Sequence, residues 1–346
     1  MDGTIGALSA ADPSPLFGVY YWGIAVIKAI QTIESPALTT LMRFLTALGT
    51  ELLYIPVILF IYWCADTRGG MRLGVLLMVS SWSNSFLKNL LGQPRPYTLD
   101  PSVGRGFEAS YGIPSGHAQH SLVFWIAAVP LVKKPFLKMP ARIAAAFFIP
   151  LIAFTRLYLG LHFPTDIFGG WIAGAVLLAL YFLFAGRLEA LLAGLNPRYR
   201  MILAALAAFL INASGVGADQ GGLFLGFCCG CGLMNRHIGF AADAPVKDKK
   251  PGAAILLARY VLGAAGAVLL YLALKALLPG EESIFADLPL WGAASPYHEL
   301  GRFLRYGALA LWISAGAPWL FCRAGLAERR AGSNSGDNAA ARAQDD

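Results

Sequence analysis

Three short stretches of the sequence combine ionisable residues, histidines and helix-starting residues, and each lies beside a long apolar run. They are KNLLGQPRP (88–96), YGIPSGHAQHS (111–121) and TRLYLGLHFPTD (155–166). Ionisable groups within or beside membrane-spanning segments are costly, and they usually mark a functional site. These stretches are therefore the candidates for chemistry.

The first chemical feature is a set of three cations, Lys88, Arg95 and Arg156. Lysine offers a compact point charge, whereas the planar arginine fork can bind an oxyanion through two parallel hydrogen bonds. Taken singly, a basic residue at a helix end has a simpler interpretation, because it often only extends toward the membrane surface. Together, the three cations suit a doubly charged anion.

The second feature is the start of a helix. Pro114 and Ser115 are typical first residues of a helix, and Gly116 lets a backbone approach a ligand closely. The unpaired N–H groups of a first turn, at the positive end of the helix dipole, attract an anion. His117 would lie on this turn. The alternative is a capped helix with a structural histidine.

The third feature is His162, followed across a proline by Asp166. The carboxylate can fix the tautomer and orientation of the imidazole, although such a pair taken alone is more often structural. With His117, the chain has two imidazoles, one for a nucleophile and one for an acid. Phosphoryl transfer without a metal ion is predicted, because fixed cations can stabilise the charge that magnesium otherwise neutralises. The residues do not decide which histidine attacks.

The elements that carry these stretches are predicted to be membrane-spanning helices. Of the 346 residues, 57% are hydrophobic and 14% are charged, against roughly 25% charged in a soluble domain. The apolar runs are continuous rather than alternating, which favours helices over strands. Nine spans are predicted, at approximately 45–64, 70–91, 115–132, 141–160, 165–185, 201–217, 220–234, 253–278 and 303–322. The fold class is therefore all-α, a polytopic transmembrane helical bundle of about nine spans with a five-span catalytic core.

The distribution of basic residues predicts the topology. If residues 65–72 face the cytoplasm, most of the 27 lysines and arginines fall in cytoplasmic loops. The three polar stretches then meet at the extracytoplasmic surface, with the N-terminus outside and the C-terminus inside. We expect a multi-pass protein of the cell (inner) membrane whose site faces the extracytoplasmic side. The net charge of +7 is a topology signal and does not indicate a nucleic-acid partner.

Four segments are expected along the chain. Residues 1–36 form an extracytoplasmic N-terminal segment with an interfacial helix and no cleavable signal peptide. Residues 37–190 form the catalytic core, and residues 191–326 form additional transmembrane helices of unknown role. Their glycine- and alanine-rich runs suit close helix packing or a homo-oligomer face. Residues 327–346 have almost no large apolar residues and are expected to be a disordered cytoplasmic tail.

The spacing of the three stretches resembles a known family signature. Lys88 is followed after six residues by Arg95 and Pro96, then come Pro114-Ser115-Gly116-His117, and then Thr155-Arg156, five residues, His162, three residues and Asp166. This resembles the three-part signature of the type 2 phosphatidic acid phosphatase superfamily, which includes lipid phosphatases, glucose-6-phosphatase and vanadium haloperoxidases. The resemblance covers residues 88–166 directly. The third part usually begins with serine, and Thr155 supplies a hydroxyl as well.

The resemblance implies a role for each residue of the signature. Lys88, Arg95 and Arg156 would bind the phosphate, with backbone N–H groups around Ser115 and Gly116. His162 would attack phosphorus and form a phosphohistidine, and Asp166 would hold His162. His117 would protonate the leaving group and then activate water. No cofactor and no metal are implied, and His120 is expected to face a neighbouring helix.

The predicted function is therefore hydrolysis of a lipid phosphate or diphosphate in the outer leaflet. The alternatives are a sugar-phosphate phosphatase similar to glucose-6-phosphatase, or a phosphotransferase. A transporter is a more distant alternative, because transport requires polar groups at the bilayer midplane and the polar stretches gather at one surface. Asp219, between two apolar runs, is interpreted as a solvated hairpin residue.

Overall fold

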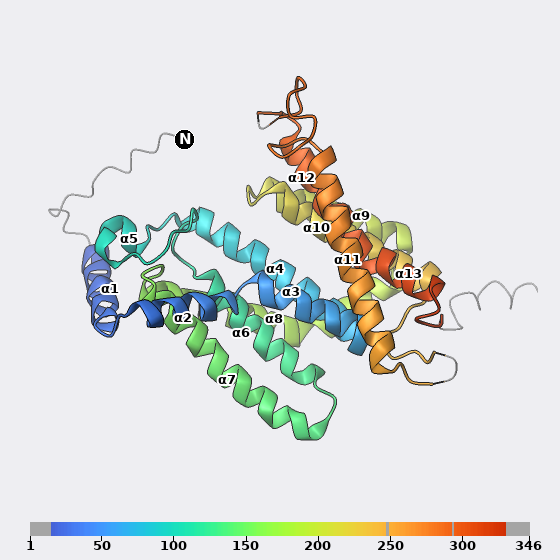
Figure 1. The fold of residues 1–346 in the computed structure, drawn as a ribbon, viewed down its shortest axis with the longest axis horizontal. Helices are drawn as coiled ribbons and strands as arrows, with labels where there is room; N and C mark the ends of the chain where they lie inside the picture. Colours follow the sequence, from blue (N-terminus) through green and yellow to red (C-terminus); the bar gives the residue numbers. More distant parts are fainter. Residues whose placement is uncertain (1–14, 247–248, 293, 330–346) are drawn as a thin grey trace, which may run out of the picture. The chain divides into compact units, whose positions relative to one another are not determined.

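The computed structural model describes residues 15–246, 249–292 and 294–329. All its named elements are helical, which confirms the predicted all-α class (Figure 1). The chain divides into two compact units. Unit 1 contains residues 1–53 and 87–177, and unit 2 contains residues 54–86 and 178–346.

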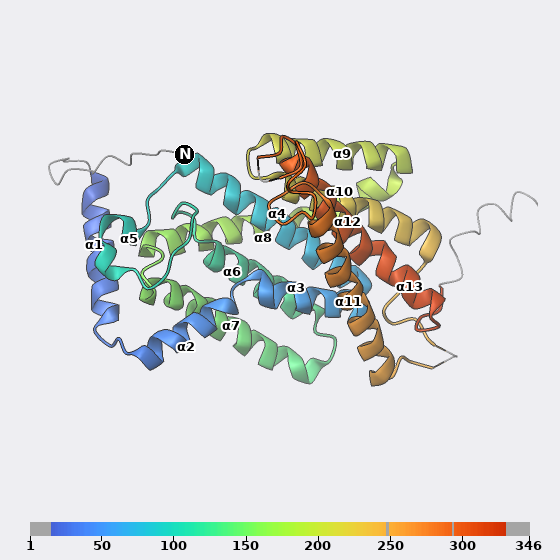
Figure 2. The same ribbon diagram turned by 45° about the horizontal axis from the view of Figure 1, so that its top comes forward.

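Unit 1 holds all three polar stretches. Its helices are α1 (Pro15–Gln31), α2 (Pro36–Ala47), the end of α4 (Thr67–Leu91), α5 (Pro96–Leu99), a 3₁₀ turn (Pro101–Val103), α6 (Gly116–Ala128), a 3₁₀ turn (Val129–Leu131), α7 (Pro135–Tyr158) and the start of α8 (Pro164–Gly194). Helices α6 and α7 form a hairpin and lie side by side in both ribbon views (Figures 1 and 2). The start of α6 and the end of α7, which lie away from the turn that joins them, carry two of the three stretches.

Local sequence sets the helix starts of unit 1. Ser35 caps α2 by accepting a hydrogen bond from the Leu38 amide at 3.2 Å, and Pro36 follows at the first helical position. Ser115 caps α6 in the same way, and α7 and α8 both begin with proline. Because serine accepts from the unpaired amides of a first turn and proline needs no amide there, these residues fix where each helix begins.

The turn between α7 and α8 depends on Gly160. Its φ is +64°, a left-handed conformation, and a Cβ atom there would lie 2.0 Å from the Val103 carbonyl oxygen. Glycine is therefore required twice, once for its conformation and once for the close backbone approach. This turn positions His162 two residues later.

Replacing Gly160 with alanine is expected to lower the free energy of unfolding by about 3 kcal/mol, because the left-handed backbone and the overlap with Val103 both oppose a side chain. Gly92 is a matched control, since its φ is +58° but a Cβ there meets nothing within 4 Å. Gly92→Ala should cost only about 1 kcal/mol. Thermal unfolding in detergent measures both, and equal shifts would contradict the prediction.

Unit 2 contains the remaining helices. They are most of α3 (Glu51–Phe60) with a π-helical turn (Ile61–Ala65), most of α4, the end of α8, α9 (Pro197–Ala213), α10 (Ala218–Leu233) with a π-helical turn (Met234–Ile238), α11 (Ala253–Leu277), α12 (His298–Leu311), a π-helical turn (Trp312–Gly316) and α13 (Ala317–Arg323). The fully buried Arg259 donates hydrogen bonds to the carbonyls of Trp63, Ala242 and Leu326. This guanidinium therefore ties three segments of unit 2 together.

Glycine brings α10 and α12 into backbone contact. A Cβ at Gly222 would lie 2.2 Å from the Phe303 carbonyl oxygen, and one at Gly226 would lie 2.0 Å from the Gly307 carbonyl oxygen. Small residues commonly allow helices to approach this closely in membranes. Asp219, in the first turn of α10, forms an ion pair with Arg302 of α12 at 2.6 Å. The residue interpreted as a solvated hairpin residue thus also joins these two helices.

Three helices of the described chain are long and apolar enough to cross a membrane: α7, α8 and α11. The pair α2 and α3 with its π-helical turn, bent by 41°, would make a fourth. Helices also cover the other predicted ranges. Helix α6 has only 13 residues, fewer than the ~20 needed to cross the hydrocarbon core, whereas α10 and α12 continue directly into the π-helical turns Met234–Ile238 and Trp312–Gly316. The protein is an integral, multi-pass membrane protein, and the nine-span layout stays a prediction.

The two ends of the chain are only partly described. Helix α1 lies within the segment predicted to be interfacial, and its Lys28 pairs with Asp100 at 2.7 Å. Its place at a membrane surface stays a prediction. Most of the tail expected to be disordered, residues 330–346, lies outside the described residues.

Candidate active site

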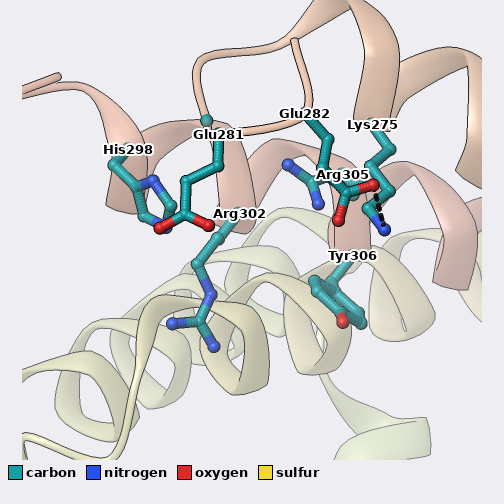
Figure 3. Close-up of a pocket in the computed structure, with 8 residues that line it drawn as sticks. Lys275, Glu281, Glu282, His298, Arg302, Arg305 and Tyr306 are labelled. Atoms are coloured by element: carbon teal, nitrogen blue, oxygen red, sulfur yellow. Dashed lines mark ion pairs between the residues drawn. The ribbon is translucent and has the colours of Figure 1, made fainter. Parts of the chain in front are cut away.

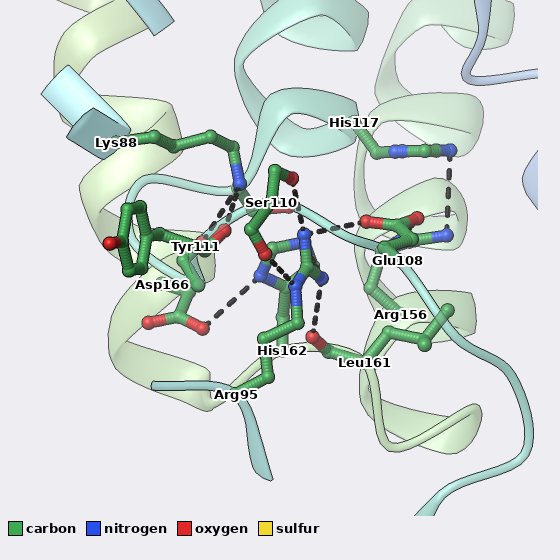
Figure 4. A network of polar contacts seen from close by, with 12 residues as sticks. Lys88, Arg95, Glu108, Ser110, Tyr111, His117, Arg156, Leu161, His162 and Asp166 are labelled. Carbon is green, nitrogen blue, oxygen red and sulfur yellow. Dashed lines mark hydrogen bonds and ion pairs between the residues drawn. The ribbon is translucent and has the colours of Figure 1, made fainter. Parts of the chain in front are cut away.

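The three polar stretches come together in unit 1 (Figure 4). Lys88 lies in the last turn of α4, Arg95 directly precedes α5, and Arg156 lies in the last turn of α7. Their exposed fractions are only 7%, 2% and 2%. Because a buried cation is costly unless it is paired, three at one place indicate a site that binds negative charge.

Backbone and hydroxyl oxygens hold each cation in place. Arg95 donates to the Ser110 carbonyl at 2.6 Å, to the Ser110 hydroxyl at 2.9 Å and to the Leu161 carbonyl at 2.9 Å. Lys88 donates to the carbonyls of Tyr111 and Gly112, the latter at 3.3 Å. Arg156 donates to the Thr46 hydroxyl at 3.0 Å. The cations are thus oriented by the fold itself.

His162 lies in the turn between α7 and α8 and is 1% exposed. Its Nδ1 lies 3.1 Å from Asp166 Oδ2, which also accepts a hydrogen bond from the Phe163 amide at 2.9 Å. Its Nε2 lies 3.3 Å from an Arg95 nitrogen. A neutral imidazole that donates through Nδ1 to a carboxylate keeps its lone pair on Nε2. The lone pair therefore faces the cations.

His117 approaches the same group of cations from α6. It is half-buried in the first turn of that helix, and its Nε2 lies 3.4 Å from an Arg156 nitrogen. Each histidine thus presents Nε2 to a different arginine. Gly49 leaves room for this arrangement, because a Cβ there would lie 3.0 Å from the His117 ring.

At the start of α6, the Ser115 amide already has a partner within the protein, whereas a simple anion site would leave it unpaired. The Ser115 amide donates to the Asp166 carbonyl at 2.9 Å, and the Ser115 hydroxyl accepts from the Ala118 amide at 3.5 Å. Gly116 is the first residue of the helix. Ser115 therefore joins α6 to the start of α8 with its backbone amide and caps α6 with its side chain.

Thr155, the departure from the family pattern, is fully buried. Its hydroxyl donates to the Ile152 carbonyl at 2.6 Å within α7. A serine in the same place could make the same bond to the preceding turn. The substitution therefore changes only one buried methyl group.

Sequence reasoning missed Glu108. This residue lies in the loop before α6, and its carboxylate forms ion pairs with Arg95, at 2.7 Å, and with Arg156 (Figure 4). The only sequence signal was an acidic residue nine positions before His117, and spacing alone did not place it on two arginines far away in the chain.

Burial and charge set the ionisation of the two groups that lie in loops. Burial, followed by the nearby charges of Arg156 and Arg95, holds the pKa of His162 well below its ordinary value. For Glu108, burial alone would raise the pKa, but Arg156 and Arg95 hold it below its ordinary value. At neutral pH His162 is therefore neutral, and Glu108 is ionised.

A separate polar cavity of about 310 Å³ lies in unit 2, between the end of α11 and the start of α12 (Figure 3). Lys275 and Glu282 pair across it at 2.6 Å. None of the residues that the sequence singled out for chemistry lines it. Among the described residues, no group of three or more His, Cys, Asp or Glu side chains is placed to hold a metal ion.

The chain has helices long enough to cross a membrane, and it brings two histidines, one aspartate and three cations into one cluster. These features define a multi-pass membrane protein with an anion site. The family model described as the PAP2 superfamily matches residues 69–189, and that of the PAP2 superfamily phosphatase transmembrane extension matches residues 218–329. The chain belongs to the PAP2 superfamily. This confirms the resemblance drawn from the three motifs. The second match also assigns residues 218–329, in which no motif was recognised, to the same superfamily.

Two curated relatives illustrate the extent of the similarity. Sphingosine-1-phosphate phosphatase 2 of Mus musculus is 34% identical over 146 residues, which are 40% of this chain and 40% of that protein. Phosphatidylglycerophosphatase B of Bacillus subtilis (strain 168) is 33% identical over 171 residues, which are 47% of this chain and 81% of that protein. The chain thus spans less than half the length of the mouse relative but most of the bacterial one.

Among solved structures, the crystal structure of a transmembrane PAP2-type phosphatidylglycerolphosphate phosphatase from Bacillus subtilis aligns with a TM-score of 0.44. The alignment covers 49% of this chain and 87% of that chain, at 28% sequence identity.

Proposed function

We propose that this protein is a membrane phosphatase that hydrolyses a lipid phosphate or diphosphate through a phosphohistidine intermediate. The observation that carries the proposal is His162, whose Nδ1 is fixed by Asp166 while its Nε2 lies 3.3 Å from Arg95. This arrangement puts a neutral nucleophile next to the cations that would bind the phosphate.

The first step forms the phosphohistidine. Arg95, Arg156 and Lys88 neutralise the oxygens of the phosphoryl group, and the Nε2 lone pair of His162 attacks phosphorus. The N–P bond forms while the P–O bond to the leaving group breaks. The leaving oxygen takes that electron pair and receives a proton from His117. Asp166 stabilises the positive charge that develops on His162.

The second step releases phosphate. Water attacks the phosphorus atom, His117 takes a proton from that water, and the N–P bond breaks so that its electron pair returns to His162. His117 is thereby protonated again, and His162 is neutral again. An acceptor alcohol in place of water would give phosphotransfer, which is why that alternative uses the same site.

A lipid substrate is favoured by the protein's setting and by its relatives. Two helices long and apolar enough to cross a membrane, α7 and α8, lie on either side of His162 in the sequence. The two relatives described above are named for sphingosine 1-phosphate and for phosphatidylglycerophosphate. We propose that the substrate lies in the outer leaflet, that the site faces the extracytoplasmic side, and that the chain crosses the membrane nine times. The proposed segments are residues 1–36, 37–190, 191–326 and 327–346.

Phosphate release from a panel of substrates tests this proposal. Phosphatidylglycerophosphate, sphingosine 1-phosphate and an isoprenyl diphosphate are presented in detergent micelles, and glucose 6-phosphate is presented in solution, each with and without EDTA. At least one lipid substrate should be hydrolysed at the same rate with the chelator, because the chemistry relies on fixed cations. Hydrolysis of glucose 6-phosphate alone would favour the sugar-phosphate alternative, and loss of activity in EDTA would contradict the mechanism.

A further inference from the structure

Glu108 holds the two arginines that the proposed function assigns to the phosphate. One carboxylate oxygen pairs with Arg95 at 2.7 Å, and the other pairs with Arg156. Both arginines use their NH2 nitrogen for this contact, while their NH1 nitrogens lie near His162 and His117. A phosphoryl group bound between the histidines would meet the NH1 nitrogens first, and a two-bond contact with either guanidinium would also need the NH2 hydrogens that Glu108 accepts.

The backbone around Glu108 is anchored on both sides. The Tyr97 hydroxyl donates to the Glu108 carbonyl at 2.7 Å and accepts from the Glu108 amide at 3.2 Å. Arg105, earlier in the loop, pairs with Glu34 and donates its amide to the Leu159 carbonyl at 2.9 Å. Ser110, after Glu108, is bonded to Arg95. The loop thus presents the carboxylate at a fixed place.

The Glu108 side chain can nevertheless leave this contact, because it is partly exposed to solvent. It is 30% exposed, whereas each arginine it contacts is 2% exposed. A rotation of the glutamate side chain can move its carboxylate toward solvent while Tyr97 keeps the backbone in position. The carboxylate is therefore a displaceable partner of a fixed pair of cations.

Displacement favours some anions over others. A tethered carboxylate competes at a high effective concentration, which raises the dissociation constant of every anion that needs the same arginines. A phosphodiester carries one negative charge, as the carboxylate does. A phosphomonoester carries nearly two at neutral pH and has three terminal oxygens, so that it can also reach Lys88, which is held nearby by Tyr111 and Gly112. Only the monoester gains enough to replace Glu108.

We infer that Glu108 is an internal competing anion. It weakens the binding of every phosphate ligand at the arginines, so that weakly bound phosphodiester headgroups stay out of the site while phosphomonoesters still replace it. The inference rests on the proposed function, because it takes the arginines to be the phosphate site. It explains how a buried tricationic site can operate in a membrane, where phosphodiester lipids surround it.

The test compares ligand binding in Glu108→Gln with wild type. Inorganic phosphate serves as the dianion, and dimethyl phosphate serves as the singly charged diester. Each is titrated against the thermal unfolding midpoint of the full chain in detergent, which gives a dissociation constant without any turnover. Both constants are expected to fall by the same factor, about tenfold, because each ligand is released from the same competitor. The Michaelis constant of a lipid monoester should fall with them.

Two further variants make the test specific. Glu108→Asp keeps the charge but withdraws the carboxylate by one methylene, so its constants should lie between those of wild type and Glu108→Gln. Glu34→Gln removes an acid that pairs with Arg105 of the same loop, and its constants should match wild type. Unchanged constants in Glu108→Gln would overturn the inference. A gain for phosphate without a gain for dimethyl phosphate would also overturn it, because Glu108 would then act by repulsion alone.

The same data separate this inference from the proposed function. If wild type hydrolyses lipid phosphates but Glu108→Gln binds both anions as wild type does, only the inference fails. If the variant binds both anions about ten times more tightly but wild type hydrolyses no phosphate ester, the internal anion stands and the proposed reaction fails.

Discussion

Replacing His162 with alanine is expected to reduce phosphate release by roughly 10⁴-fold, because it removes the proposed nucleophile and leaves only the proposed binding groups. The substrate should still bind, since Lys88, Arg95 and Arg156 remain. The loss is therefore expected in kcat, with little change in the Michaelis constant. His237→Ala is the matched control, because His237 is exposed in a π-helical turn of unit 2. It should retain full activity.

A second measurement separates a lost nucleophile from a lost fold. Wild type quenched in base after brief exposure to a substrate labelled in its phosphate should retain label on a histidine, whereas His162→Ala should retain none. Thermal unfolding in detergent shows whether the variant is folded. Turnover or labelling at the wild-type level in a folded His162→Ala protein would assign the nucleophile to another residue.

His117→Ala is expected to show the second-largest effect, about 10³-fold on an alkyl phosphate, because no group protonates the leaving oxygen. The effect should depend on the leaving group. The leaving group of p-nitrophenyl phosphate is p-nitrophenolate, a stable anion that needs little help from an acid. The variant should therefore form its phosphohistidine from this substrate almost as fast as wild type. The second step should then be slow, since His117 also activates the water.

This pattern gives His117 a signature that a structural residue would lack. Stopped-flow release of p-nitrophenol should show a burst equal to the amount of enzyme, followed by slow turnover, whereas wild type shows steady release. Equal losses on both substrates, with no burst, would indicate that the alanine variant only disturbs the position of Arg156, whose nitrogen lies 3.4 Å from His117.

The sequence predicted those parts of the site that local spacing determines. His162 and Asp166 are four residues apart, and the turn between α7 and α8 brings Nδ1 to within 3.1 Å of the carboxylate. Ser115 was predicted to start a helix, and it caps α6. Both features depend on residues close together in the chain, where helix starts and turns leave few alternatives.

Long-range contacts were beyond the same reasoning. Glu108 meets Arg156 across 48 positions of the chain, and Arg302 meets Asp219 across 83. Neither pair has a sequence period or a motif, because each depends on how separate helices and loops pack. Hydropathy had a related limit, since it located the helices but did not fix which of them are long enough to cross the bilayer.

The contact between α10 and α12 limits where a lipid chain could enter unit 2. At Gly222 and Gly226 the two backbones are so close that even a methyl group would overlap a carbonyl oxygen of the facing helix. An acyl chain is wider than a methyl group and cannot slip between them. The seam between these two helices of unit 2 is therefore closed to an acyl chain at these two turns.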